Sequence, residues 1–247
     1  MLFIMSDHVT LRYAAASDRG LVRASNEDSL YAGSRLVAVA DGVGGQAAGE
    51  VASELAIEAV APLDDVDSDD PVEDLRAAVD AANRMIRAAS EADPSRLGMA
   101  TTITALYLSR GKLALAHAGD SRAYLLRDGE FSQVTRDDTY VQRLVEEGRI
   151  TAEEAGTHPQ RSLVTRVLQG SQVEATVTSP EPVPGDRYLL CSDGLPDAVP
   201  ADEIESTLRD ESDLERCVSR LVQLALAGGG PDNITVIVAE ITPDPSD

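Results

Sequence analysis

Short runs of apolar and β-branched residues recur along the chain, and Gly, Asp or Pro bounds each of them. Several runs are apolar almost throughout, which is typical of strands that are buried on both faces. This pattern predicts strands over residues 11–17, 34–41, 101–108, 112–119, 121–128, 173–179, 186–193 and 233–241.

Other segments repeat their apolar residues with the helical period instead. Consecutive strands, such as those within residues 112–134, are joined by turns short enough for hairpins, which favours antiparallel sheets over repeated βαβ crossovers. We therefore predict two sheets packed face to face, with helices covering the outside. The helical segments are residues 46–60, 72–90, 140–147 and 214–227.

Acidic residues outnumber basic ones by 43 to 21, which gives a formal net charge of −22. Such a charge repels nucleic acid and anionic membrane surfaces, so we expect neither as a partner. Much of the excess is expected on solvated surface. Residues 64–74 contain seven acidic residues among eleven with no regular apolar period, and we predict an exposed loop there.

The length of 247 residues suits one large domain, which we predict over residues 1–247 with an ordered core over about 6–241. The two cysteines do not form the framework of a disulfide-rich secreted protein. No run of about 18 apolar residues predicts a membrane helix. We expect a cytoplasmic protein without a membrane segment, either by itself or as the cytoplasmic part of a longer membrane-anchored protein.

Several aspartates lie where predicted strands end or begin. Asp41 and Asp193 each precede a glycine after an apolar run, Asp120 follows one, Asp232 comes just before the last strand and Asp28 lies in a polar segment. Asp-Gly is also a common turn signal, so a single such aspartate does not indicate a metal site. Several of them at separate strand ends favour the hypothesis that they bind metal ions. Carboxylates and backbone carbonyls are the ligands that Mg²⁺ or Mn²⁺ prefers, and these cations keep several waters.

Motifs of other protein classes either conflict with neighbouring residues or are missing. GVGGQA at residues 42–47 fits a dinucleotide-binding turn, but Asp41 would set a carboxylate beside the pyrophosphate. A cysteine-dependent phosphatase needs an arginine six residues after its nucleophilic cysteine. That position is Asp197 for Cys191 and Gln223 for Cys217, which excludes this class. A G-x-S-x-G nucleophile elbow and a phosphate-binding P-loop are both absent from the sequence.

With these residues in view, the chain resembles the metal-dependent serine/threonine protein phosphatases of type 2C, particularly their bacterial branch. The resemblance spans nearly the whole chain and implies an α+β fold, a four-layer αββα sandwich. The motifs that carry it are SDRGLVRASNEDS (17–29), ADGVGGQAAGEVAS (40–53), MATTITA (99–105), GDSRAYL (119–125), HPQRS (158–162), CSDGLPD (191–197) and GGPDNITV (229–236).

The resemblance also implies a catalytic centre with two Mn²⁺ or Mg²⁺ ions. Their ligands would be Asp41, the Gly42 carbonyl, Asp193 and Asp232, with Asp28 acting mainly through a bound water. The implied reaction is direct hydrolysis, in which a water that bridges two cations has its pKa lowered and attacks phosphorus in line.

A third metal site is implied at Asp120 and Asp193, with help from Ser162. Ser162 belongs to a flap over about residues 135–168, where we expect substrate choice to be made. Arg23 matches the arginine that binds the substrate phosphate. The implied partners are phosphorylated proteins, among them Ser/Thr kinases and their substrates, and we expect a monomer.

Residues around these motifs have expected supporting roles. Asn233 is expected to orient the turn that carries Asp232, and Asp18 to cap a turn. His117, in a strand before GDSR, is expected to be a packed residue or to support the site from behind. Asp197 is expected to support the metal site in the same way.

Three positions depart from the family pattern, namely Val43, Gln46 and Pro196. None of them removes a metal ligand. They are the support for an alternative, a catalytically silent module of the same fold that binds phosphorylated proteins. A phosphatase of small molecules is a further alternative, and Val43 leaves the general acid unassigned.

Overall fold

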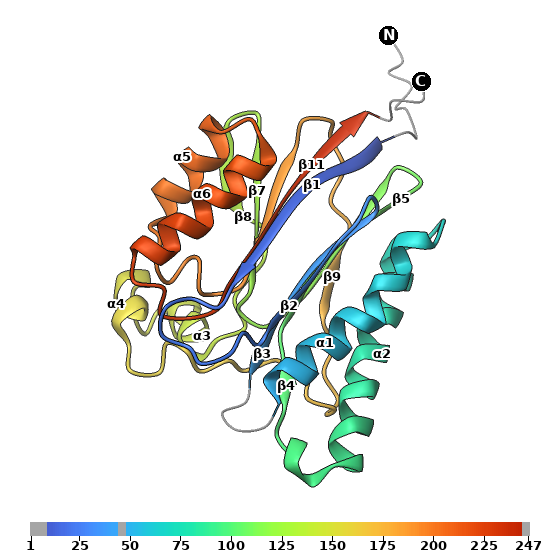
Figure 1. The fold of residues 1–247 in the computed structure, drawn as a ribbon, viewed down its shortest axis with the longest axis vertical. Coiled ribbons are helices and arrows are strands. Elements are labelled where there is room, and N and C mark those ends of the chain that lie inside the picture. The colour runs from blue at the N-terminus through green and yellow to red at the C-terminus, as the bar shows by residue number, and fades with distance from the viewer. Residues whose placement is uncertain (1–8, 44–47, 244–247) are drawn as a thin grey trace.

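The computed structural model describes residues 9–43 and 48–243. Its two β-sheets pack face to face, with helices on both outer surfaces (Figure 1). Every strand pairing is antiparallel. The first sheet has five strands in the order β1 (Val9–Asp18), β11 (Ile234–Pro243), β10 (Arg187–Cys191), β7 (Arg122–Arg127) and β8 (Glu130–Gln133).

The second sheet carries the early strands of the chain together with one late strand. The antiparallel prediction is confirmed, but within residues 112–134 only β7 and β8 form a hairpin. Residues 112–118 belong to the second sheet, so the turn after them leads from one sheet to the other. The order in the second sheet is β2 (Asp28–Ala32), β3 (Leu36–Val43), β5 (Ile103–Ser109), β6 (Lys112–Ala118) and β9 (Thr176–Thr178), and β4 (Ala100–Thr101) pairs with the end of β3.

Helices complete four layers, which confirms the predicted αββα sandwich (Figure 1). α1 (Gly49–Val60) and α2 (Pro71–Ala92) cover the second sheet, while α5 (Ala201–Asp210) and α6 (Leu214–Ala227) cover the first. The remaining helices are α3 (Tyr140–Glu146) and α4 (Ala152–Thr157) at one end of the sandwich, and the short 3₁₀ helices η1 (Ala61–Asp65) and η2 (Pro94–Arg96).

β3 shows why the central strands are apolar on both faces. Val37 and Val39 belong to the cluster between the two sheets, whereas Leu36, Ala38 and Ala40 belong to the cluster under α1 and α2. All five side chains are fully buried. Since successive side chains point to opposite faces of a strand, a strand enclosed by a sheet and a helical layer is a continuous apolar run.

Some elements were not predicted. β2 and β8 were missed, and so was α5, which buries only Ile204 and Leu208 and is otherwise polar. α4 was missed because none of its residues is buried. The predicted helix start at Gln46, like residues 6–8 of the predicted core, lies outside the described residues.

The exposed loop predicted over residues 64–74 was partly wrong. Asp64 lies within η1, and its Oδ1 accepts hydrogen bonds from the backbone N–H groups of Arg35 and Leu36 at 2.7 and 2.9 Å. Asp70 caps the N-terminus of α2, where its side chain accepts from the Glu73 N–H. These carboxylates make local backbone hydrogen bonds, a role that carries no apolar period.

Within the described part of the chain, no helix combines the length and apolar character needed to cross a membrane.

Candidate active site

A cavity of about 450 Å³ opens at the end of the sandwich where β3 and β10 end and β11 begins. A second cavity, of about 400 Å³, adjoins it beneath α3 and α4. Asp120, Asp193 and Ser162 line both. The first is also lined by Arg23, Glu27, Asp41, Gly42, Val43, Arg161, Val164, Asp197, Pro231 and Asp232.

Asp41 is held near the end of β3 by hydrogen bonds to its backbone. Its N–H donates to Thr102 Oγ1 at 2.9 Å, and its carbonyl accepts from the Thr102 N–H and from Thr101 Oγ1, each at 2.9 Å. Gly42 follows, and a Cβ there would lie 2.3 Å from the Gly49 carbonyl oxygen. Only glycine therefore allows α1 to start this close to the end of β3.

Asp28 is the first residue of β2 and lies opposite Asp41 in the antiparallel pair of β2 and β3. Ser192 Oγ, from the other sheet, donates a hydrogen bond to Asp28 Oδ2 at 2.7 Å. Asp28 Oδ1 is buried and has no hydrogen-bond partner in the structure. Leaving a buried acceptor unpaired costs about 1–3 kcal/mol, so this oxygen suits a water or a cation.

Asp193 and Asp120 follow strands of opposite sheets. Asp193 comes just after β10, and its carbonyl accepts from the Asp197 N–H at 2.9 Å. A Cβ on Gly194 would lie 2.0 Å from the Asn233 carbonyl oxygen, so this turn packs directly against the start of β11. Asp120 follows Gly119, whose φ of 117° favours glycine.

Arg23 reaches the cavity from the loop between β1 and β2. Its Nη2 donates to Asp232 Oδ2 at 2.6 Å. The other carboxylate oxygen, Oδ1, accepts from the Asn233 N–H at 2.8 Å. Asp232 thus places a guanidinium group at the edge of the acidic cavity.

Asn233 holds this loop in place. Its Nδ2 donates to the carbonyls of Arg19 and Ser25, both at 2.9 Å, and its Oδ1 accepts from the Glu27 N–H at 2.8 Å. The Asn233 side chain thus joins the turn that carries Asp232 to the loop that carries Arg23, and its predicted role of orienting that turn stays a prediction. Asp18 caps the turn as predicted, because its Oδ1 accepts from the Gly20 N–H at 2.8 Å.

Many flap residues line one of the cavities, and two of them line both. Ser162 lines both of them, as does Arg161, whose Nη1 donates to Asp197 Oδ2 at 2.6 Å. This contact ties the flap to the turn that carries Asp193. Asp197 therefore supports the site by holding Arg161.

Four aspartates at the site have raised pKa values. Burial is the largest cause and raises the pKa of both Asp28 and Asp120 to about 6. The pKa values of Asp41 and Asp193 are raised well above their usual range, first by burial and then by the neighbouring carboxylates. A divalent cation relieves this repulsion because it favours the charged forms.

A cation site requires several donor groups close together. Among the described residues, no three His, Cys, Asp or Glu side chains are grouped closely enough to hold a metal ion by themselves. This agrees with the behaviour of Mg²⁺, which keeps several waters and takes only one or two carboxylates directly. The carboxylates, the unpaired Asp28 Oδ1 and the open cavity fit such a hydrated cation.

Sequence reasoning missed two residues that line the cavity. Arg161 lies beside Ser162 within the HPQRS motif, so its position was the available signal. Glu27 precedes Asp28, and its pKa is raised first by burial and then by Glu50. Its place at the cavity depends on the backbone bond that the Gly42 N–H donates to the Glu27 carbonyl at 3.1 Å, which no local pattern indicates.

The family profile described as Protein phosphatase 2C matches residues 12–234. The serine/threonine protein phosphatase PstP of Mycobacterium tuberculosis is 57% identical over 237 residues, which are 94% of this chain and 45% of that protein. The chain thus spans about half the length of that relative. The serine/threonine phosphatase stp of Listeria welshimeri is 34% identical over 91% of this chain and 93% of its own length.

Solved structures agree with the sequence comparison. The crystal structure of the M. tuberculosis PstP/Ppp phosphatase has a TM-score of 0.91 and 57% identity, and covers 94% of this chain and 99% of that chain. The catalytic domain of PstP in complex with two manganese ions has a TM-score of 0.90 and 55% identity, and covers 95% of this chain and 99% of that chain.

Proposed function

Because the chain belongs to the protein phosphatase 2C family of serine/threonine protein phosphatases, we propose that it hydrolyses phosphoserine and phosphothreonine in proteins with Mn²⁺ or Mg²⁺. The observation that carries this proposal is the cavity in which Arg23 lies among Asp41, Asp193 and Asp232. These three carboxylates come from strand ends far apart in the sequence.

We assign the two cations to Asp41, the Gly42 carbonyl, Asp193 and Asp232, with Asp28 holding a coordinated water. The partnerless Asp28 Oδ1 and the raised pKa values of Asp41 and Asp193 support this assignment. A third cation is proposed at Asp120, Asp193 and Ser162, the three of these residues that line both cavities.

Arg23 and Asn233 have separate parts in the proposed reaction. When bound, the cations lower the pKa of a water and offset negative charge on the phosphoryl oxygens. Arg23 binds the phosphate at the edge of the cavity and stabilises charge on the same oxygens. Asn233 keeps the Arg23 loop in place through its bonds to Arg19, Ser25 and Glu27.

We further propose that the substrates are phosphorylated proteins, including Ser/Thr kinases and the proteins that they phosphorylate, and that the chain acts as a monomeric single domain. A cytoplasmic setting is supported by the cysteines, Cys191 and Cys217, which are both buried and free. Substrate choice is assigned to the flap, because Arg161 and Ser162 bring it to the cavity.

The direct test is hydrolysis of a phosphothreonine peptide by the purified protein with Mn²⁺, with Mg²⁺ and with EDTA. Turnover is expected with either metal and is expected to cease with EDTA. A parallel assay on sugar phosphates separates a protein phosphatase from a small-molecule phosphatase. Binding of the phosphopeptide without turnover, in any metal, would favour the catalytically silent module instead.

Arg23→Ala is expected to lower kcat/KM for the phosphopeptide by roughly tenfold to a hundredfold. The lost contact is a hydrogen bond to a charged group, which contributes about 1.5–3 kcal/mol. Steady-state kinetics would measure the effect, with Arg19→Ala as a control from the same loop. Equal kinetics for wild type and Arg23→Ala would exclude Arg23 from phosphate binding.

A further inference from the structure

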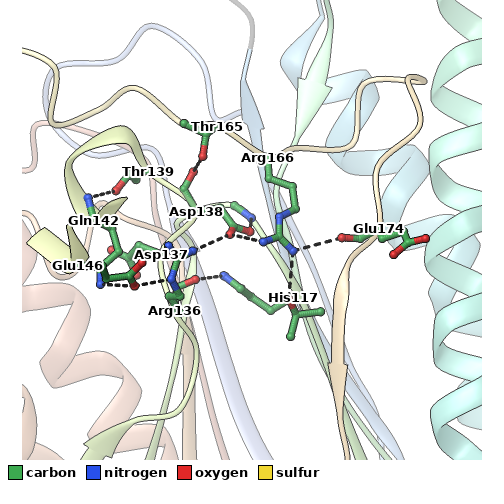
Figure 2. Close-up of polar contacts among 12 residues, drawn as sticks. His117, Arg136, Asp137, Asp138, Thr139, Gln142, Glu146, Thr165, Arg166 and Glu174 are labelled. Atoms are coloured by element: carbon green, nitrogen blue, oxygen red, sulfur yellow. Dashed lines mark hydrogen bonds and ion pairs between the residues drawn. The ribbon is translucent and has the colours of Figure 1, made fainter. Parts of the chain in front are cut away.

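Asp138 is a buried aspartate at the base of the flap, behind the two cavities. Its side chain is 4% exposed and lines neither of them. Figure 2 shows the carboxylate between two arginines, Arg136 and Arg166. Asp138 Oδ1 lies 3.4 Å from Arg136 Nη1 and 2.9 Å from Arg166 Nη2. The two arginines are the cationic partners that a buried carboxylate needs.

Asp138 also binds the loop that carries Asp120. The Gly119 N–H donates to Asp138 Oδ2 at 3.2 Å, and the Asp138 N–H donates to the Gly119 carbonyl at 2.7 Å. Gly119 is the residue directly before Asp120. A shift of Asp138 therefore shifts the backbone that positions the Asp120 carboxylate.

The returning arm of the flap is fastened to the same residue. The Asp138 carbonyl accepts from the Thr165 N–H at 2.6 Å and from Thr165 Oγ1 at 2.8 Å (Figure 2). Next to this contact, Thr139 forms an antiparallel bridge with Val164, and the Tyr140 N–H donates to the Leu163 carbonyl at 2.9 Å. These bonds join residues 138–140 to residues 163–165, next to Ser162, which lines the cavity.

His117 fixes the segment that leads into Asp138. Its Nε2 lies 2.9 Å from the Arg136 carbonyl oxygen, and its Nδ1 lies 3.0 Å from Thr104 Oγ1. His117 is on β6 and Thr104 on β5, so the base of the flap is joined to the centre of the second sheet. The expectation that His117 is a packed, supporting residue is confirmed.

We propose that Asp138 is a positioning residue that holds the flap in register with the loop carrying Asp120, so that Ser162 and Asp120 face the same cation. This inference rests on the proposed function. Asp138 touches neither substrate nor cation and acts through Gly119 and Thr165. Residues that orient metal ligands from behind typically contribute about 10–100-fold to metal affinity or activity.

The test compares Asp138→Asn with Asp186→Asn. Asp186 is the control because it is similarly buried, with 1% exposure, and is paired with Arg127. It lies just before β10, at the opposite end of that strand from Asp193. Both variants remove one buried charge beside an arginine, so both are expected to lower the melting temperature. Only Asp138→Asn is expected to raise the Mn²⁺ concentration for half-maximal rate, by about tenfold or more.

A milder variant, Thr165→Val, keeps the volume of the side chain and removes the bond from Oγ1 to the Asp138 carbonyl. It is expected to move the Mn²⁺ dependence in the same direction by a smaller factor, and it serves if Asp138→Asn does not fold. An unchanged Mn²⁺ dependence in both variants would overturn the inference. So would an equal change in Asp186→Asn.

Hydrogen–deuterium exchange separates this inference from the proposed function. Asp138→Asn, or Thr165→Val in its place, is expected to speed amide exchange over residues 139–165, whereas Asp186→Asn leaves that segment unchanged. Exchange requires no turnover, so the flap contact is tested even if the wild-type protein shows no hydrolysis. Unchanged exchange in the flap would contradict the positioning role, while an inactive wild type would contradict only the phosphatase proposal.

Discussion

Asp193→Ala is expected to reduce metal-dependent turnover of a phosphothreonine peptide by roughly a thousandfold or more. Charge stabilisation by the cations contributes several kcal/mol to the transition state, and each 1.4 kcal/mol is about tenfold in rate. Asp193 is the proposed ligand that both the two-metal centre and the third site share. Its loss is therefore expected to weaken cation binding at both proposed sites.

A titration with Mn²⁺ distinguishes the proposed role from a loss of folding. Raising the metal concentration is not expected to restore the rate of Asp193→Ala, because the ligand itself is missing. Asp213→Ala is the control, since Asp213 caps α6 by accepting from the Arg216 N–H and lies outside both cavities. A rate for Asp193→Ala within tenfold of wild type would contradict the metal assignment.

Mn²⁺ is expected to raise the melting temperature of the wild-type protein by roughly 5 to 10 °C. A ligand at 100 times its dissociation constant adds about 2.7 kcal/mol to the unfolding free energy, and each kcal/mol is worth about 2–4 °C for a chain of this size. EDTA is expected to reverse the rise. Differential scanning calorimetry at pH 5.5 and pH 7.5 would measure it.

The pH dependence follows from the direction of the pKa shifts. Asp28 and Asp120, with pKa values of about 6, and Asp41 and Asp193, with raised values, hold protons that the unfolded chain releases at lower pH. In the metal-free protein this contribution to stability is complete below the unfolded pKa of about 4. The part from Asp28 and Asp120 is lost as pH rises through about 6, and the part from Asp41 and Asp193 is lost as pH rises through their own raised pKa values.

The rise in melting temperature with Mn²⁺ is therefore expected to be larger at pH 7.5 than at pH 5.5. Protons compete with the cation for the same carboxylates at the lower pH. In Asp193→Ala the difference between the two pH values is expected to shrink. An equal response to Mn²⁺ at both pH values in the wild type would contradict the assignment of these carboxylates to the metal site.

The strands that carry the proposed ligands were the most predictable part of the molecule. β3 and β10 are enclosed on both faces, so their sequences are nearly continuous apolar runs that stop at Asp41 and Asp193. Burial thus fixes both the strand and the point where a carboxylate can emerge. That these strand ends meet at one cavity follows from the topology of the fold. Only the resemblance of the motifs to a known family indicated it, because no local pattern in the sequence does.

Arg161 and Asp138 show what local patterns leave out. Arg161 is 36 residues from its partner Asp197, and Asp138 is 19 residues from Gly119. Neither contact has a period along the chain. α5 escaped prediction for a related reason, because two buried residues in ten give a weak helical stripe.

β11 lies between β1 and β10, although it is the last strand of the chain. A ribosome releases β11 after the other strands of this sheet, so the five-stranded sheet lacks an inner strand until β11 has been made. Asp232 arrives with that strand, and so does the anchor for the loop of Arg23. The nascent chain consequently cannot assemble this site before β11 has joined the sheet.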